Sequence, residues 1–180
     1  MYRYKYCNKL PYTVSIQIPS GHLERINSLL KKYGLENHVG GHISLKYLGY
    51  EEHLTDEKLM DIVNALRSCF LGFEKQDLRV AGFGIMQGCN AFFNDLLYVK
   101  IEPYYYLKSI HETIISCLED KTDLFEMHDL DHYTPHISSG AIERHNIIDM
   151  LNDDYRQMDS IIIDDWSIVV HTSREEYRIR

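Results

Sequence analysis

The sequence has few cysteines, no long hydrophobic run and no excess of basic residues, and each shortage argues against a class of protein. Four cysteines lie far apart without a Cys-x-x-Cys pair, at positions 7, 69, 89 and 117. This spacing favours free thiols in a reducing compartment, so we expect a cytoplasmic protein. No apolar run approaches the ~20 residues that span a bilayer. Residues 1–7 lack an apolar signal core, so we expect neither a membrane anchor nor export.

The charge balance is acidic. The net charge is −8, from 19 lysines and arginines against 27 aspartates and glutamates, with no basic run. Proteins that bind long nucleic acids usually display a basic surface, because phosphate neutralisation dominates their affinity. We therefore expect no long nucleic-acid partner, although a few well-placed groups could bind a small anion. The 180 residues suit a single domain over 1–180, and we expect a monomer.

Two short apolar segments, residues 40–49 and 133–140, each contain His-Ile-Ser. In a strand, residues two apart point to the same face. The imidazole and the hydroxyl of each segment therefore share one face, while the isoleucine between them faces the core. The two pairs are His42 with Ser44, and His136 with Ser138. Two such pairs indicate the two halves of one site.

The pattern of elements also recurs. Residues 12–86 are predicted to run strand, helix, strand, helix, strand, and residues 96–170 repeat that order. We expect strands at 12–19, 78–86, 96–102 and 160–170, strands around His42 and His136, a last short strand within 176–180, and helices at about 23–33, 55–70, 107–118 and 143–152. The histidines are 94 residues apart, at equivalent places in the two halves. This predicts an α+β fold with two pseudo-two-fold-related lobes, 12–86 and 96–170, facing a central cleft.

Two histidines on opposite walls of a cleft are suited to general acid–base catalysis. With an ordinary pKa near 6.5, one ring can be neutral while the other is protonated. The serine hydroxyls can donate hydrogen bonds to phosphate oxygens and hold phosphorus between the rings. No metal or cofactor is needed when the substrate supplies a ribose hydroxyl, so we expect neither. The catalytic candidates are His42 and His136, and the phosphate-binding candidates are Ser44 and Ser138.

Other residues are weaker candidates for the site. Gln17, Tyr98 and Lys100 are expected on the faces that line the cleft, and Lys46 falls on the His42 face by simple alternation. Aromatic residues could stack on a base or simply pack in the core; they are Phe92, Phe93, Tyr133 and Trp166. We interpret His171 as structural. The spacing of His128, His132 and His136 suggests a metal-binding helix, but Pro135 disfavours a helix through it.

The segment His-Ile-Ser-Leu-Lys-Tyr-Leu-Gly (42–49) resembles the first signature of the two-histidine (2H), or LigT-like, phosphoesterases, and Thr-Pro-His-Ile-Ser (134–138) resembles the second. Residues 80–103 are similar to the middle segment of that family, and residues 161–173 to its last strand. The resemblance implies a bilobal fold with antiparallel sheets around a groove, and metal-independent phosphodiester chemistry by His42, His136, Ser44 and Ser138. The sequence departs from the family at Ser139, where an apolar residue is common.

The sequence is compatible with three functions. The first is a phosphodiesterase for small 2′-5′-linked nucleotides, such as 2′-5′ oligoadenylate or a 2′-5′-containing cyclic dinucleotide such as 2′,3′-cGAMP, which would counteract innate immune signalling. The acidic composition favours this substrate class over RNA. The second is hydrolysis of 2′,3′-cyclic phosphates at RNA ends. The third is a nucleotide-binding module without catalysis, against which the intact histidines and serines argue.

Overall fold

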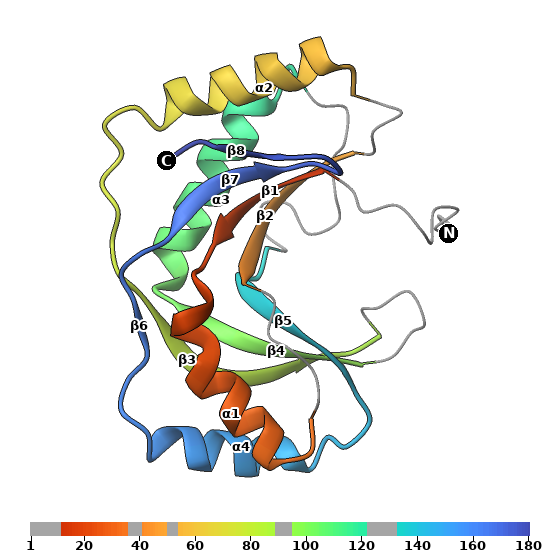
Figure 1. The fold of residues 1–180 in the computed structure, drawn as a ribbon, viewed down its shortest axis with the longest axis vertical. Helices are drawn as coiled ribbons and strands as arrows, with labels where there is room; N and C mark the ends of the chain where they lie inside the picture. The colour runs from red at the N-terminus through yellow and green to blue at the C-terminus, as the bar shows by residue number, and fades with distance from the viewer. Residues whose placement is uncertain (1–11, 36–40, 50–53, 89–94, 122–132) are drawn as a thin grey trace.

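The computed structural model describes residues 12–35, 41–49, 54–88, 95–121 and 133–180. These residues form two antiparallel four-stranded sheets and four α helices, which confirms the expected α+β class (Figure 1). The helices pack on the sheets in two pairs, α1 (Glu24–Lys32) with α4 (Ile147–Arg156) and α2 (Asp56–Cys69) with α3 (Tyr104–Leu118). The strand that carries His42 contacts both α3 and the strand that carries His136.

Each sheet combines strands from both halves of the sequence. The first has the order β2-β1-β7-β8, and the second has the order β5-β4-β3-β6. The strands of the first sheet are β1 (Tyr12–Gln17), β2 (His42–Gly49), β7 (Ser167–His171) and β8 (Glu176–Arg178). Those of the second are β3 (Leu78–Met86), β4 (Asp95–Glu102), β5 (His136–Ile142) and β6 (Ile162–Ile163). Thus β3 and β7 each join the sheet of the other half. The two histidine strands, β2 and β5, are edge strands that lie beside each other.

Two helix ends show local signals that are visible in the sequence. The Thr55 side chain accepts a hydrogen bond from the Lys58 amide at 3.2 Å and caps the N-terminus of its helix. Gly34 follows another helix with a φ of +69°, a conformation that favours glycine. The helices are α1 (Glu24–Lys32), which follows a 3₁₀ turn (Ser20–Leu23), α2 (Asp56–Cys69), α3 (Tyr104–Leu118) and α4 (Ile147–Arg156).

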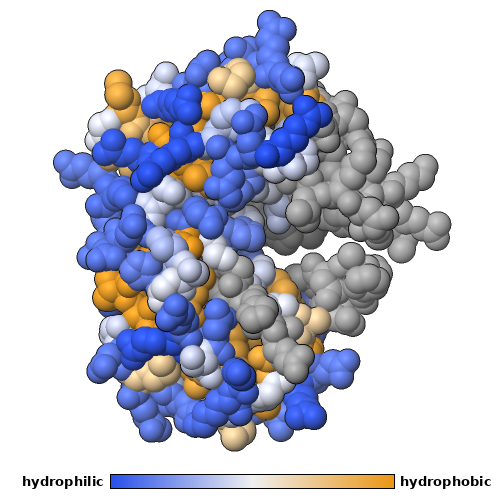
Figure 2. Space-filling model, viewed as in Figure 1, coloured by the Kyte–Doolittle hydropathy of each residue, from blue (hydrophilic) through white to orange (hydrophobic). Residues whose placement is uncertain are grey.

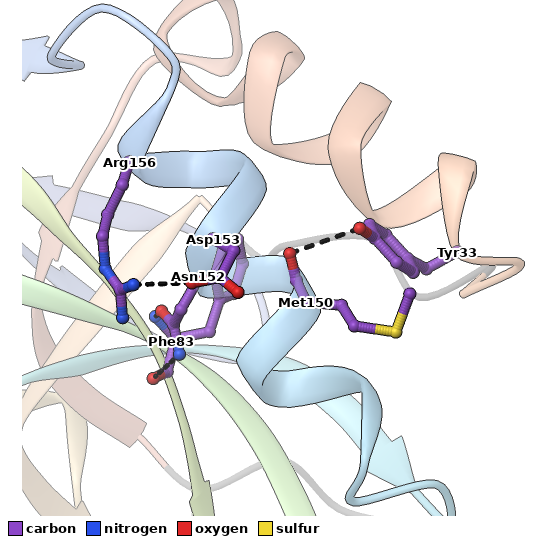
Figure 3. A network of polar contacts seen from close by, with 6 residues as sticks. All are labelled: Tyr33, Phe83, Met150, Asn152, Asp153 and Arg156. Atoms are coloured by element: carbon purple, nitrogen blue, oxygen red, sulfur yellow. Dashed lines mark hydrogen bonds and ion pairs between the residues drawn. The ribbon is translucent and has the colours of Figure 1, made fainter.

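A side chain of α4 completes the hydrogen bonding of β3. The ladder between β3 and β4 shifts register between Val80 and Gly82. Asn152 accepts a hydrogen bond from the Phe83 amide at 2.8 Å and donates one to the Phe83 carbonyl at 3.3 Å, as Figure 3 shows. The same helix is tied to α1, because the Tyr33 hydroxyl donates to the Met150 carbonyl at 3.2 Å. These bonds hold the helix layer in place at the end of the molecule far from β2.

Two predicted elements differ in the structure. The expected strand at 160–170 is two strands, β6 and β7, in different sheets. Between them Trp166 turns into the core, where its indole donates to the Gln76 carbonyl at 2.9 Å. The chain crosses from one sheet to the other at this point, so the β-branched run is not one strand. The helix expected at 143–152 begins at Ile147, because the buried face recurs at Ile147 and Leu151.

Figure 2 shows that hydrophilic residues predominate on one face of the described part, with hydrophobic residues in small separate groups. Of the helices that the structure describes, none combines the length and apolar character needed to cross a bilayer.

Candidate functional site

The first His-x-Ser pair lies on β2 beside polar residues of β1. The strands are antiparallel, with Gln17 opposite His42 and Ser15 opposite Ser44. Opposed residues of a sheet share a face, so the polar face predicted by alternation is confirmed. Ile43 on the other face is fully buried and fixes the strand against the core. His42 is exposed and Ser44 is half-buried, so both can be reached from solvent.

The second pair has the same register in the other sheet. Lys100 lies opposite His136, and Tyr98 lies opposite Ser138. Ile137, like its counterpart in β2, is fully buried. His136 is half-buried, whereas Ser138 and Lys100 are exposed. The structure therefore places Tyr98 and Lys100 beside the second pair, as it places Gln17 beside the first.

A β-bulge follows each pair and changes which side chains reach the site. In β2, Ser44 pairs with Ser15 and Lys46 with Val14, so Leu45 is an extra residue. Because the extra residue reverses the alternation, Lys46 lies on the face of the core residue Val14 and is only 4% exposed. The expectation that Lys46 shares the face of His42 is wrong for this reason. Tyr47 takes that face instead, and alternation alone could not identify it.

The corresponding bulge in β5 falls on Ser139. Tyr98 pairs with Ser138 and Leu97 with Gly140, which leaves Ser139 without a cross-strand partner. Its hydroxyl is buried and has no hydrogen-bond partner within the part of the chain that the structure describes. Ser139 is 94 residues after Leu45, the extra residue of β2. The departure from the family pattern thus lies at the bulge itself.

The two histidines lie within electrostatic range of each other. The pKa of His42 is lowered from its ordinary value of 6.5, first by desolvation, then by the charge of His171 and then by that of His136. Although the ring is accessible to solvent, protein atoms around it remove much of its hydration, which disfavours the imidazolium. Since β2 and β5 are adjoining edges, His42 and His136 face one region from two different sheets.

The second histidine is oriented by its own backbone. His136 Nδ1 lies 2.7 Å from the Thr134 carbonyl. A carbonyl can only accept, so Nδ1 carries the hydrogen and Nε2 points away from this bond. The Tyr98 ring meets the imidazole edge-on, with centroids 5.5 Å apart at 71°. Partial burial raises the pKa of Tyr98, so its hydroxyl stays protonated and can donate a hydrogen bond at neutral pH.

A third histidine, His171, lies next to the first. The centroids of His171 and His42 are 6.3 Å apart. Nδ1 of His171 is 3.0 Å from a Glu176 carboxylate oxygen. The sequence predicted a structural role for His171. The pairing of β7 with β1 places His171 opposite Thr13 and so brings it to the site. The Nε2 atom of His171 is buried. The effect of His171 on His42 is electrostatic, because its charge lowers the pKa of His42.

The prediction that Tyr133 or Trp166 could stack on a base is wrong. Tyr133 is 6% exposed and packs face to face against His111, with centroids 4.0 Å apart. Trp166 is 1% exposed in the core. Neither ring has a face available to a base. Phe92 and Phe93 lie outside the described residues, as do the histidines at 128 and 132 of the metal alternative. Among the described residues, no group of three histidine, cysteine or acidic side chains is placed to hold a metal ion.

The arrangement has the parts that displacement at phosphorus requires. Two imidazoles approach from different sheets, and each has a serine two residues along its strand. One ring can accept a proton while the other donates one, and hydroxyls beside them can bind non-bridging oxygens.

Known structures share this architecture. No protein-family model matches the sequence, and no curated protein matches it significantly. The structure superposes on E. coli LigT complexed with 3′-AMP with a TM-score of 0.59, at 13% identity over 96% of this chain and 97% of that one. The chain has the LigT-like fold. LigT complexed with NADP⁺ gives a TM-score of 0.52 at 14% identity, covering 96% of both chains.

A second protein with this fold is Usb1 from Kluyveromyces marxianus, solved with uridine monophosphate. The TM-score is 0.54 at 10% identity, covering 94% of this chain and 98% of that one. The fold expected from the resemblance of the two signatures is therefore confirmed. The LigT-like fold extends over nearly the whole chain.

Proposed function

We propose that this protein is a metal-independent phosphodiesterase that cleaves 2′-5′ phosphodiester bonds in small nucleotides. The observation that carries the proposal is the pair His42 and His136, held in the same register on adjoining edge strands and within range of each other's charge. In a 2′-5′ linkage, the free 3′-hydroxyl lies next to phosphorus. Its attack forms a 2′,3′-cyclic phosphate and releases the 5′-oxygen, and each histidine handles one of the two protons.

We assign the base role to His42 and the acid role to His136. The lowered pKa of His42 keeps its ring neutral near pH 7, so it can take the proton of the 3′-hydroxyl. The hydrogen bond from Nδ1 of His136 to the Thr134 carbonyl favours the charged ring, because a charged donor bonds more strongly. His136 then protonates the departing 5′-oxygen through Nε2. In this assignment, Ser44 and Ser138 bind the non-bridging oxygens.

The preference for a small nucleotide rests on charge. Within the part of the chain that the structure describes, Lys100 is an exposed cation next to His136, while the whole chain carries a net charge of −8. One cation beside the acid suits one phosphate group, whereas a long polynucleotide would meet an acidic surface. The structures of the same fold that hold uridine monophosphate or 3′-AMP are in keeping with this size of ligand. The biological role we propose is removal of a 2′-5′-linked immune messenger in the cytoplasm by a monomeric enzyme.

A substrate panel tests the proposal. The protein is incubated in EDTA with 2′-5′-linked diadenylate, its 3′-5′ isomer, a 2′-5′-containing cyclic dinucleotide and a nucleoside 2′,3′-cyclic phosphate, and products are resolved by chromatography. We expect cleavage of the 2′-5′ compounds without added metal. Turnover of the 2′,3′-cyclic phosphate alone would instead indicate the RNA-end activity. Tight binding of nucleotides without any product would indicate a non-catalytic module.

The two histidines are tested within the same panel. His42→Ala and His136→Ala should each lower kcat by ~10²–10⁴-fold, the usual contribution of one acid–base group. His145→Ala is the matched control, because His145 is half-exposed and pairs with Asp95 at the far end of β4. It should turn over substrate at the wild-type rate. Retention of activity by either of the first two variants, with an unchanged melting temperature, would contradict the proposed roles.

A further inference from the structure

A buried histidine, His111, lies between the His42 strand and the segment that leads into the His136 strand. The inner face of α3 consists of buried apolar residues at helical spacing, Leu107, Ile110, Ile114 and Leu118. His111 occupies a position of this face and is 1% exposed. A titratable ring is costly to bury unless it is hydrogen-bonded. Its place in the core therefore points to a specific contact that an apolar residue could not make.

One contact of His111 is with the bulge of β2. Its Nδ1 lies 2.6 Å from the carbonyl oxygen of Leu45. Leu45 is the extra residue of the bulge, without a cross-strand partner on β1. The carbonyl only accepts, so Nδ1 carries the hydrogen and donates it. His111 therefore stabilises the residue that directly follows Ser44.

A second contact of His111 is with the segment that leads into β5. The imidazole stacks on the Tyr133 ring with centroids 4.0 Å apart and planes 7° from parallel. Tyr133 is buried and precedes Thr134, whose carbonyl orients His136. The Tyr133 carbonyl also accepts a hydrogen bond from the Tyr104 hydroxyl of α3 at 3.4 Å. One ring thus contacts the strand that carries His42 and the segment that leads into the strand that carries His136.

We propose that His111 is a positioning residue that sets the placement of the His42 strand relative to the His136 strand. The proposal rests on the phosphodiesterase function for its kinetic consequences, but its structural part stands without it. The edges of two separate sheets share no ladder between them, so their spacing depends on side chains packed behind both. Acid–base catalysis is sensitive to such spacing, since a misplacement of about 1 Å can cost ~10²-fold in rate.

Substitutions that separate the two contacts test this role. His111→Phe keeps a ring for stacking but removes the donor, while His111→Asn keeps a donor near the position of Nδ1. We expect His111→Phe to lower kcat by about 10–100-fold with KM changed by less than about threefold. His111→Asn should recover most of the loss. A purely structural role would lower the folded fraction without this rescue and without a change in kcat per folded molecule.

Tyr155→Phe is the matched control. In the wild type, the Tyr155 hydroxyl donates to the Val80 carbonyl at 2.8 Å. The variant therefore also removes one hydrogen bond to a strand carbonyl, but away from both histidine strands. It should retain the wild-type kcat. If Tyr155→Phe lowers kcat as much as His111→Phe, the effect of His111 is general destabilisation and the proposal is overturned.

Amide chemical shifts give a readout that does not depend on turnover. In ¹H–¹⁵N spectra, His111→Phe should shift the amides of both Ser44 and Ser138, whereas Tyr155→Phe should leave them in place. Should His111→Phe not fold, Tyr133→Leu removes only the stacking and should shift Ser138 more than Ser44. Unchanged amides in the folded variants would overturn the proposal. A wild-type protein without turnover, but with these shifts, would refute the phosphodiesterase function and leave the positioning role supported.

Discussion

Replacing Gly84 with alanine should displace Tyr98 and, through it, the proposed acid. Gly84 lies opposite Tyr98 in the ladder between β3 and β4. A Cβ atom at position 84 would lie 2.5 Å from the Tyr98 Cζ and 2.6 Å from its hydroxyl oxygen. Non-bonded carbon atoms prefer about 3.5–4.0 Å. The outer end of the ring must therefore move by about 1 Å.

This displacement reaches the site because the Tyr98 ring contacts His136 edge-on at 5.5 Å. The methyl group meets the far end of a side chain, so the ring can yield. We expect a loss of stability of about 1 kcal/mol, at the low end for overpacking. The effect on catalysis should be larger, because a shift of about 1 Å in a catalytic group can cost ~10²-fold. We therefore expect kcat/KM to fall about 10–100-fold.

The assay is kcat/KM on the 2′-5′-linked diadenylate, together with a urea titration of each variant. Gly21→Ala is the control, because a Cβ at that position would have no heavy atom of the described residues within 4 Å apart from its chain neighbours. It should match the wild type in both measurements. The double variant Gly84→Ala/Tyr98→Leu removes the ring that is displaced, so its loss should be smaller than the sum of the two single losses. Wild-type kcat/KM in Gly84→Ala would show that the position of the Tyr98 ring does not control His136.

Three further predictions concern the pKa of His42 and the bulge of β5. The pH–rate profile should be a bell whose acid limb lies below pH 6.5, because the lowered pKa keeps His42 neutral to lower pH. His171→Asn removes one positive neighbour, so the pKa of His42 should rise and the acid limb should move to higher pH; an unmoved limb would contradict this electrostatic effect. Ser139→Ala should increase the free energy of unfolding by about 1 kcal/mol in urea, because it removes a buried hydroxyl without a partner among the described residues. Destabilisation by Ser139→Ala would show that the hydroxyl is bound.

The strands of the site could be predicted because their side chains alternate. Ile43 and Ile137 each separate an imidazole from a hydroxyl, and burial of the isoleucine is enough to fix the opposite face. The registers of β1 with β2 and of β4 with β5 confirm this for both pairs.

Lys46 shows a limit of predicting strand faces from alternation. A bulge adds one residue to one strand, and no local pattern reveals it, because the extra Leu45 is itself a suitable strand residue. The same limit applies to residues 160–170, where an apolar β-branched run suggests one strand. The chain instead leaves one sheet at Asp164 and enters the other at Ser167. Which sheet a strand joins depends on contacts far away in the sequence.

The burial of His111 could be predicted from the sequence. His111 lies four residues after Leu107 and three before Ile114, so the helical spacing puts it on the apolar face of α3. A histidine in that position indicates a buried polar contact. Its partners, Leu45 and Tyr133, could not be identified, since they lie 66 residues before it and 22 residues after it.

The proposed function requires that His42 and His136 act on one phosphate group. A crystal structure of the protein with adenosine 2′-monophosphate tests it most directly. We expect a phosphate between the rings, with oxygens within about 3.2 Å of both Nε2 atoms and of the Ser44 and Ser138 hydroxyls. A phosphate that contacts only one histidine, or that binds elsewhere on the chain, would contradict it.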